Sequence, residues 1–275
     1  MIDISQYNEK GFILIKGIIP KQEIQDILCD AKRVFFEQFK YKKYTSVLSC
    51  DALPEKDFNE CLYRLFTEDF ICLSNCGKQV QHLISLHRLS LSDIILCLLK
   101  EVGLKKPIIS TRPVLYFNHP NLAKKKVFHQ IDAHQDWRSM QGSLNSAVIW
   151  VPLIDINKSL GALRILPKSH KDGLRTELLE QGFGMVSLTE SERQHLLDVE
   201  VTQGDLLIFS SFLIHQSGEN VTEGPRWSCH FRYNDLMEES FICRAYAHPY
   251  LYKPQEELIT PNFPLKSDLD YTFKI

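Results

Sequence analysis

The sequence has no apolar run long enough to cross a bilayer, and no Gly/Ser-rich or Pro-rich stretch divides its 275 residues. Its first residues lack the basic region and apolar core of a secretory signal. Basic and acidic side chains nearly balance, at 32 and 34, so no charge excess favours nucleic acid or an anionic membrane. We therefore expect one domain over residues 1–275, cytoplasmic, with neither of those partners; the oligomeric state is left open.

The eight cysteines lack the dense spacing of a small disulfide-stapled scaffold. We interpret them as free thiols in a reducing compartment. Cys72, Cys76, His82 and His87 superficially suggest zinc, but only five residues separate the cysteine pair from the histidine pair, too few for a finger loop. In a helix, Cys72 and Cys76 lie on one face and would simply pack.

Apolar residues in the first hundred positions recur at helical spacing. Pro20 can begin a helix, and a stripe suited to burial follows it: Ile24, Ile27, Leu28, Ala31, Phe35 and Phe39. We expect further helices over residues 60–72 and 79–102, with Gly103 ending the second. The N-terminal part of the chain, over about residues 20–103, should thus be helical.

Short β-prone runs separated by turn signals dominate the rest of the chain. One run precedes the helical part at residues 11–19, and the others cover 108–117, 146–154, 161–166, 205–215 and 226–233. Helices followed by many short strands favour an antiparallel jelly roll, mainly β with flanking helices and a core over about 108–235. This architecture is the cupin-like double-stranded β-helix.

His134 and Asp136 are separated by one residue. In an extended strand their side chains share one face while Gln135 points away. His215 can supply a third ligand, and two histidines with one carboxylate are the facial set that binds non-haem Fe(II) and leaves positions open. The His-x-Asp pattern alone is common, so the interpretation depends on what surrounds it.

Arg226 follows His215 by 11 positions (226 − 215) and opens a strand-like run. A guanidinium holds a carboxylate through two parallel hydrogen bonds, which suits the distal carboxylate of 2-oxoglutarate. A lone arginine on a strand is more often a surface ion-pair partner. Its distance from His215 favours the pocket role.

These motifs resemble the phytanoyl-CoA dioxygenase-like branch of the Fe(II)/2-oxoglutarate oxygenases. The stretch from His215 through Ser217-Gly218 and Asn220 to Arg226 is similar to the family's distal motif, and residues 133–137 resemble its first metal box. Residues 161–170 resemble its central Gly-x-Leu-x-x-x-Pro-x-Ser-His segment, and residues 201–209 the approach to the distal histidine. The resemblance spans about residues 7–233 in four ordered motifs.

The resemblance implies the jelly-roll fold and a role for each matching residue. His134, Asp136 and His215 would bind Fe(II) and form the catalytic centre. Arg226 and Ser217 would hold the distal carboxylate of 2-oxoglutarate. Three weaker candidates for the same pocket are Gln135, Trp150 and Tyr116, and the last two are equally compatible with ordinary core packing.

The implied reaction consumes O2 and 2-oxoglutarate, releases succinate and CO2, and oxidises a C–H bond of a small molecule. Related halogenases replace the carboxylate ligand with a small residue, so Asp136 favours hydroxylation or a related oxidation. Two alternatives stay open: a catalytically silent jelly-roll binding protein, and a hydrolase using another divalent metal.

The substrate itself is not identified by the sequence. If Arg226 points inward, strand alternation places Ser228, His230 and Arg232 on the same side, so His230 and Arg232 become candidates for substrate binding. Trp137 and Arg138, next to the metal box, are further candidates. Lys124-Lys125-Lys126 suits either a solvated loop or a phosphate contact, and the loop is the preferred interpretation.

Overall fold

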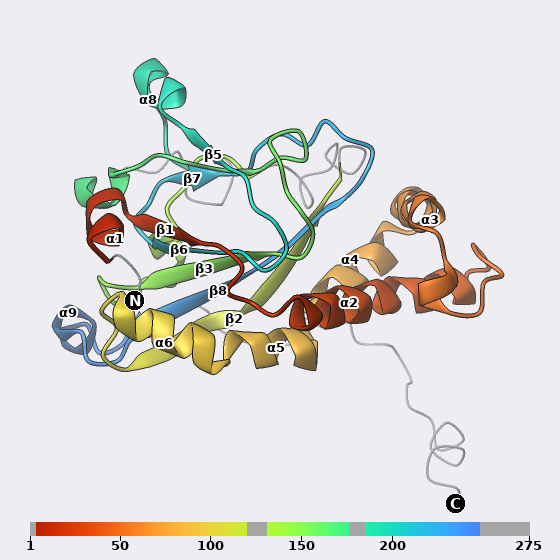
Figure 1. Cartoon of the computed structure of the whole chain (residues 1–275), viewed down its shortest axis with the longest axis horizontal. Helices are drawn as coiled ribbons and strands as arrows, with labels where there is room; N and C mark the ends of the chain where they lie inside the picture. Colours follow the sequence, from red (N-terminus) through yellow and green to blue (C-terminus); the bar gives the residue numbers. More distant parts are fainter. Residues whose placement is uncertain (1–3, 120–130, 176–184, 248–275) are drawn as a thin grey trace, which may run out of the picture.

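The computed structural model describes residues 4–119, 131–175 and 185–247 (Figure 1). Lys124-Lys125-Lys126 lies outside these residues. The helices are α1 (Ile4–Lys10), α2 (Lys21–Tyr41), α3 (Glu55–Glu68), α4 (Phe70–Gln79), α5 (Ile84–Ser90), α6 (Asp93–Glu101), α7 (Trp137–Met140), α8 (Glu190–Gln194) and α9 (Glu239–Cys243). Short 3₁₀ turns are η1 (Cys50–Ala52), η2 (Val80–His82) and η4 (Ser169–Asp172).

The strands form two antiparallel sheets. They are β1 (Phe12–Ile15), β2 (Pro107–Asn118), β3 (Ala147–Pro152), β4 (Leu163–Ile165), β5 (Leu197–Val199), β6 (Leu206–Ser210), β7 (His215–Gln216) and β8 (Arg226–Asp235). The larger sheet has the order β1-β6-β3-β8-β2, and the smaller one the order β5-β4-β7. Strand β8 pairs on both sides, with β2 and β3, so hydrogen bonds fix its backbone along both edges.

Apolar side chains from the two sheets meet in one interior. Val148 and Trp150 of β3 and Phe209 of β6 pack with Leu163 and Ile165 of β4 in a single buried cluster. Two sheets facing each other across such a core make a jelly roll. The predicted fold class, a jelly roll with flanking helices, is confirmed by the antiparallel sheets.

Helices α2, α5 and α6 cover the other face of the larger sheet, opposite the smaller sheet (Figure 1). Phe35 of α2 is fully buried and meets Phe117 of β2 edge to face, with ring centroids 5.2 Å apart. It also meets Trp227 of β8 at 6.0 Å. Because side chains alternate along β8, Trp227 faces the helices while its neighbour Arg226 faces the interior of the roll.

The helix boundaries differ from those expected. The segment near residues 60–72 is helical as expected except at Asp69, which ends α3 and caps α4: its side chain accepts a hydrogen bond from the Cys72 amide at 2.9 Å. The helix predicted over 79–102 is divided into η2, α5 and α6, with Ser92 capping α6. The strand predicted over 205–215 is likewise two strands, β6 and β7.

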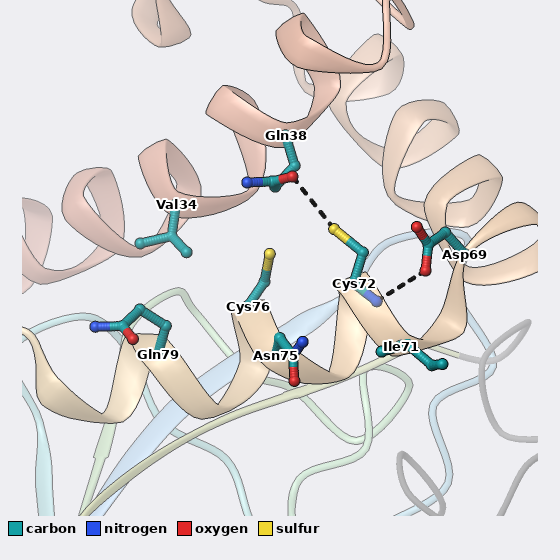
Figure 2. A pocket seen from close by; sticks show the side chains of 8 residues that line it. All are labelled: Val34, Gln38, Asp69, Ile71, Cys72, Asn75, Cys76 and Gln79. Carbon is teal, nitrogen blue, oxygen red and sulfur yellow. Dashed lines mark hydrogen bonds between the residues drawn. The ribbon is translucent and has the colours of Figure 1, made fainter. Parts of the chain in front are cut away.

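Cys72 and Cys76 lie on one face of α4 and line a cavity between α2 and α4 (Figure 2). The Cys72 thiol contacts the Gln38 side-chain oxygen at 3.4 Å. All eight cysteines are free. Cys76 is buried in the core cluster beneath the helices and Cys72 packs against it, in agreement with the expectation that they pack.

Among the helices of the described chain, none is both long and apolar enough to cross a membrane by itself. One pair, Phe70–His82 with Ile84–Glu101, meets that test of length and composition together but is bent by 45°.

Phe35→Ala tests the attachment of the helices to the sheet. We expect a loss of about 3–5 kcal/mol in the free energy of unfolding, because truncating a buried phenylalanine removes its contacts and leaves a cavity. Urea unfolding followed by circular dichroism measures it. Tyr41→Ala is the control, since Tyr41 is in the same helix but 83% exposed, and should change stability by less than about 0.5 kcal/mol. Equal stability of the two variants would contradict the packing.

Candidate metal centre

His134 and His215 are brought together by backbone pairing. They form an antiparallel bridge in which the His134 amide donates to the His215 carbonyl at 3.0 Å and the reverse bond measures 3.1 Å. A second bridge joins His134 to Met185. The two imidazole rings lie side by side, 4.2 Å apart between centroids. Two ligands from distant parts of the chain are thus fixed by the main chain itself.

Asp136 reaches the histidines by a bend in the chain and not by strand alternation. Its backbone is helical (φ −62°, ψ −31°), and it stands at the N-terminus of α7. The Trp137 amide donates to the Ser211 carbonyl at 3.0 Å, which holds the bend against the strands. The Asp136 side chain makes no cap hydrogen bond to α7, so its carboxylate is available to the histidines.

The three side chains present a coherent set of donor atoms. The Nε2 atom of His134 lies 3.6 Å from Asp136 Oδ1, and that of His215 lies 3.9 Å from Asp136 Oδ2. One ligand atom from each residue falls within 4.8 Å of the others. The residues are also largely buried, with side-chain exposures of 14%, 4% and 7% for His134, Asp136 and His215.

Both imidazoles are oriented through their other ring nitrogen. His134 Nδ1 contacts the Asp132 carbonyl at 2.8 Å, and His215 Nδ1 contacts the Leu213 carbonyl at 3.0 Å. A carbonyl partner fixes the proton on Nδ1, which leaves the Nε2 lone pair for a metal. Burial, and then the neighbouring His134, lowers the pKa of His215 to about 4, so this ring is neutral at pH 7. The donor set therefore fits Fe(II).

Arg226 faces the same interior with part of its guanidinium unused. It is 3% exposed, and its Nη1 donates to the Gly161 carbonyl, whereas its Nε has no hydrogen-bond partner. Burial lowers the pKa of Arg226 to about 10, so it still carries its charge at pH 7. Among the described residues, no carboxylate forms an ion pair with it. The guanidinium carbon lies 5.9 Å from the centroid of the Tyr116 ring.

One cavity joins Arg226 to the histidines. Of the side chains predicted for the cosubstrate and substrate, the structure places five more in its wall: Tyr116, Trp150, Ser217, His230 and Arg232. Its apolar wall, which the sequence did not single out, comes from Ile131, Val148, Leu163 and Phe209. Ser228 lines it as well, as alternation along β8 requires.

Gln135 does not line this cavity. Its side-chain amide donates to the carbonyls of Gly173 and Phe212, at 2.8 and 2.7 Å, and its side-chain oxygen accepts from the Arg175 amide at 2.9 Å. These bonds occupy the side chain on the far side of the chain from the metal ligands. The pocket role given to Gln135 is therefore corrected: it fixes the segment around Gly173.

Trp137 and Arg138 also lie outside the cavity wall. The Trp137 ring stacks on Phe212, with centroids 5.1 Å apart, and its indole donates to the Ser143 carbonyl at 3.1 Å. Arg138 donates to the Arg175 carbonyl. Because α7 begins at Trp137, the chain turns away after Asp136, and the substrate contacts predicted for these two residues are not supported.

His230 and Arg232, in contrast, point into the cavity. Arg232 Nη2 donates to Asp136 Oδ1 at 2.9 Å. Burial would raise the pKa of Asp136, but Arg232 and the neighbouring histidines hold it well below its usual range. The Nε2 atom of His230 is buried without a hydrogen-bond partner. Burial and then the Arg232 charge lower the pKa of His230 well below 6.5, so this imidazole is also neutral.

Comparison with known proteins agrees with this geometry. The model of the family described as phytanoyl-CoA dioxygenase (PhyH) matches residues 7–228. The chain belongs to this family. It is therefore an Fe(II)- and 2-oxoglutarate-dependent dioxygenase, as the ordered motifs of the sequence predict.

Relatives in the phytanoyl-CoA dioxygenase family are distant in sequence. The peroxisomal phytanoyl-CoA dioxygenase of Mus musculus is 26% identical over 251 residues, which cover 84% of this chain and 68% of the relative. A probable phytanoyl-CoA dioxygenase of Caenorhabditis elegans is 24% identical, with coverages of 84% and 74%. The chain thus spans about two thirds of the length of the mammalian relative.

Solved structures share the fold of this family member. The epimerase SnoN, in a complex with Fe3+, alpha ketoglutarate and nogalamycin RO, superposes with a TM-score of 0.58 at 15% identity, over 91% of this chain and 90% of SnoN. HygX from Streptomyces hygroscopicus, with nickel and 2-oxoglutarate bound, gives 0.52 at 18% identity, over 86% and 88% of the two chains. At these identities the likeness establishes the jelly-roll fold.

His215→Ala tests the metal centre of this dioxygenase. We expect metal affinity to fall by more than about a hundredfold, since loss of even an outer partner of a metal ligand costs 10–100-fold. Titration with Co(II), followed by visible absorption, measures this without turnover. His195→Ala, at the exposed histidine that follows α8, is the matched control and should bind as the wild type does. Unchanged affinity in the His215 variant would exclude it as a ligand.

Glu192→Gln tests the ion pair that anchors Arg175. Arg175 Nη2 lies 2.6 Å from Glu192 Oε1 and lowers the pKa of Glu192 to about 2 from 4.5. Because the folded-state pKa is the lower one, the pair stabilises the fold above pH 4.5, and this contribution is lost as pH falls toward 2. The variant should cost no more than about 1 kcal/mol at pH 7, since the pair is partly exposed. The urea midpoints of the wild type and the variant should therefore converge as pH falls toward 2. A difference that stayed constant with pH would contradict a stabilising ion pair.

Proposed function

We propose that this dioxygenase hydroxylates a C–H bond of a small-molecule substrate. The observation that carries the proposal is one buried cavity holding the His134–Asp136–His215 set together with Arg226, a cation without a carboxylate partner among the described residues. The three side chains suit the metal, and Arg226 suits the distal carboxylate of 2-oxoglutarate. A cytoplasmic location stays a prediction.

The protein side of the reaction is binding, orientation and exclusion of water. His134, Asp136 and His215 would hold Fe(II) and leave its remaining positions facing the cavity. Arg226 and Ser217 would hold the distal carboxylate of 2-oxoglutarate, with Arg226 donating from the Nε that is otherwise unpaired. When bound, Fe(II) and 2-oxoglutarate would activate O2, so that one oxygen atom of O2 enters the substrate and the other enters succinate, with CO2 as the second coproduct. The apolar wall formed by Val148, Leu163 and Phe209 limits water in the cavity.

Asp136 supports hydroxylation over halogenation. A halogenase of this superfamily needs an empty position in place of the carboxylate, whereas here the carboxylate is present, buried and held by Arg232. A metal-dependent hydrolase has no use for a buried guanidinium opposite its metal. A silent binding protein has no use for three oriented donor atoms. We therefore prefer a hydroxylase to both alternatives.

The substrate of this dioxygenase should stimulate release of succinate from 2-oxoglutarate by the Fe(II)-loaded protein under air, which a screen of small molecules measures.

Arg226→Met should weaken anaerobic 2-oxoglutarate binding at least about 30-fold, because removing one partner of a buried charge pair costs about 2–5 kcal/mol. The metal-free variant should be at least as stable to urea as the metal-free wild type, since no described residue forms an ion pair with Arg226. Arg226→Lys keeps the charge and should recover part of the affinity.

The wild-type protein decides the proposal. Absence of 2-oxoglutarate binding to the Fe(II)-loaded wild type would end it. Wild-type affinity in Arg226→Met would remove Arg226 from the cosubstrate site. Binding of 2-oxoglutarate without succinate release for any compound in a broad metabolite screen would favour the silent binding protein.

A further inference from the structure

His230 lies in the cavity wall with a ring nitrogen that the fold leaves unused. Its Nε2 atom is buried and has no hydrogen-bond partner among the described residues. His134 and His215 differ from it, because a backbone carbonyl holds Nδ1 of each of those rings. The His230 ring remains accessible from the cavity, since the residue as a whole is only partly buried. A buried polar atom without a partner opposes folding and calls for a ligand or an ordered water.

Alternation along β8 places His230 between the metal centre and Arg226. The cavity face of β8 carries, about 7 Å apart and in this order, Arg226, Ser228, His230 and Arg232. Arg232 marks the metal end of this row, because its Nη2 donates to Asp136 Oδ1 at 2.9 Å. His230 is therefore one step from the metal end, on the side of Arg226.

Strands β3 and β6 give the same order. Val148 of β3 pairs in register with Arg232 on one side and with Phe209 of β6 on the other. The Phe209 ring lies 4.8 Å from the ring of His215, between centroids, so this row of the sheet is level with the metal ligands. His230 stands in the next row, toward the site expected for the distal carboxylate. A ligand that spans the two ends of the cavity must pass over it.

2-Oxoglutarate carries an oxygen that needs a donor at this level. When its keto oxygen and one oxygen of the adjacent C1 carboxylate bind a metal, the second C1 oxygen is left without a partner. A carboxylate oxygen among apolar walls is stabilised by an N–H donor. Arg226 stands at the other end of the cavity, and Arg232 donates to Asp136. Burial, and then the Arg232 charge, keep the pKa of His230 well below 6.5, so its imidazole can donate without adding charge.

We propose that His230 binds the cosubstrate, its Nε2 donating a hydrogen bond to the C1 carboxylate of 2-oxoglutarate. The inference rests on the proposed Fe(II)/2-oxoglutarate chemistry and replaces the substrate contact that the sequence suggested for His230. The two ends of the dianion are then held separately, the distal carboxylate by Arg226 and the keto-acid end by the metal and His230. An ordered water on Nε2, or a polar group of the substrate, is the competing partner.

His230→Leu is the main variant, because leucine fills much of the same space without a polar atom. Cys229→Ala is the matched control, since Cys229 is the preceding residue of β8 and is fully buried on the helical side of the sheet. Anaerobic titration of the Fe(II)-loaded protein, followed by visible charge-transfer absorption, gives the affinity for two keto acids. These are 2-oxoglutarate and 2-oxopentanoate, which keeps the keto-acid end but lacks the distal carboxylate. Titration with Co(II) gives the metal affinity.

We expect His230→Leu to weaken both keto acids by the same factor, about 10–100-fold, as loss of a hydrogen bond to a charged group does. Arg226→Met should weaken 2-oxoglutarate alone. The metal affinity of His230→Leu should fall by less than about threefold, since His230 is not one of the converging metal donors. His230→Gln keeps an N–H donor and should recover part of the keto-acid affinity, and Cys229→Ala should bind as the wild type does.

Wild-type affinity of His230→Leu for 2-oxoglutarate would overturn the proposal and favour a water or the substrate as the partner of Nε2. A loss confined to 2-oxoglutarate would also overturn it, because the contact would then be with the distal carboxylate. Equal losses in His230→Leu and Cys229→Ala would indicate a role in packing alone, and would overturn it as well.

A crystal structure of the wild type with Zn(II) and 2-oxoglutarate decides the question even if the leucine variant does not fold. Nε2 of His230 within about 3.2 Å of a C1 carboxylate oxygen supports the proposal. 2-Oxoglutarate bound to the metal with only water at Nε2 overturns it and leaves the proposed function intact. Failure of the Fe(II)-loaded wild type to bind 2-oxoglutarate at all contradicts the proposed function itself, so the two failures are distinguishable.

Discussion

The backbone bridge between His134 and His215 is the constraint on which the rest of the site depends. Neighbouring bonds continue it: the Val186 amide donates to the Ala133 carbonyl at 2.8 Å, and the Leu166 amide to the Ile214 carbonyl at 2.9 Å. The ligands are therefore placed by a ladder of main-chain hydrogen bonds, which is more rigid than side-chain packing on a loop. The hydrogen bonds of the two Nδ1 atoms then determine only that Nε2 of each ring faces the metal.

Strand β8 connects the stability of the fold to the chemistry of the site. Trp227 packs against Phe35 and Phe117 on the helical side, and Arg226, one residue earlier, enters the cavity on the other side. A one-residue slip of β8 would exchange these faces, burying a guanidinium among aromatic rings. Pairing with both β2 and β3 makes that slip costly, so the helical layer helps to aim the arginines although it contributes no residue to the cavity wall.

The sequence predicted what regular strands determine and missed what local side-chain bonds determine. Alternation from Arg226 correctly placed Ser228, His230 and Arg232, because β8 is a regular paired strand. The same rule gave the wrong backbone at Asp136, where the Trp137–Ser211 hydrogen bond bends the chain, and Trp137 and Arg138 turned away as a result. The break at Asp69 likewise depends on one cap bond, which helical periodicity cannot reveal.

The two buried charges of the site, Asp136 and Arg226, are treated differently by the fold. Asp136 is paired by Arg232, but Arg226 keeps its charge in the interior with no carboxylate partner among the described residues. Burying an unpaired cation opposes folding, and a methionine of similar volume would not carry that cost. A divalent metal and a dianion together add no net charge, yet the distal carboxylate supplies the partner that Arg226 lacks. Ligand binding and fold stability are thereby linked through one side chain. The cost of the unpaired cation follows from the chemistry of the site, because a guanidinium whose hydrogen bonds were all made within the protein would have none left for the cosubstrate.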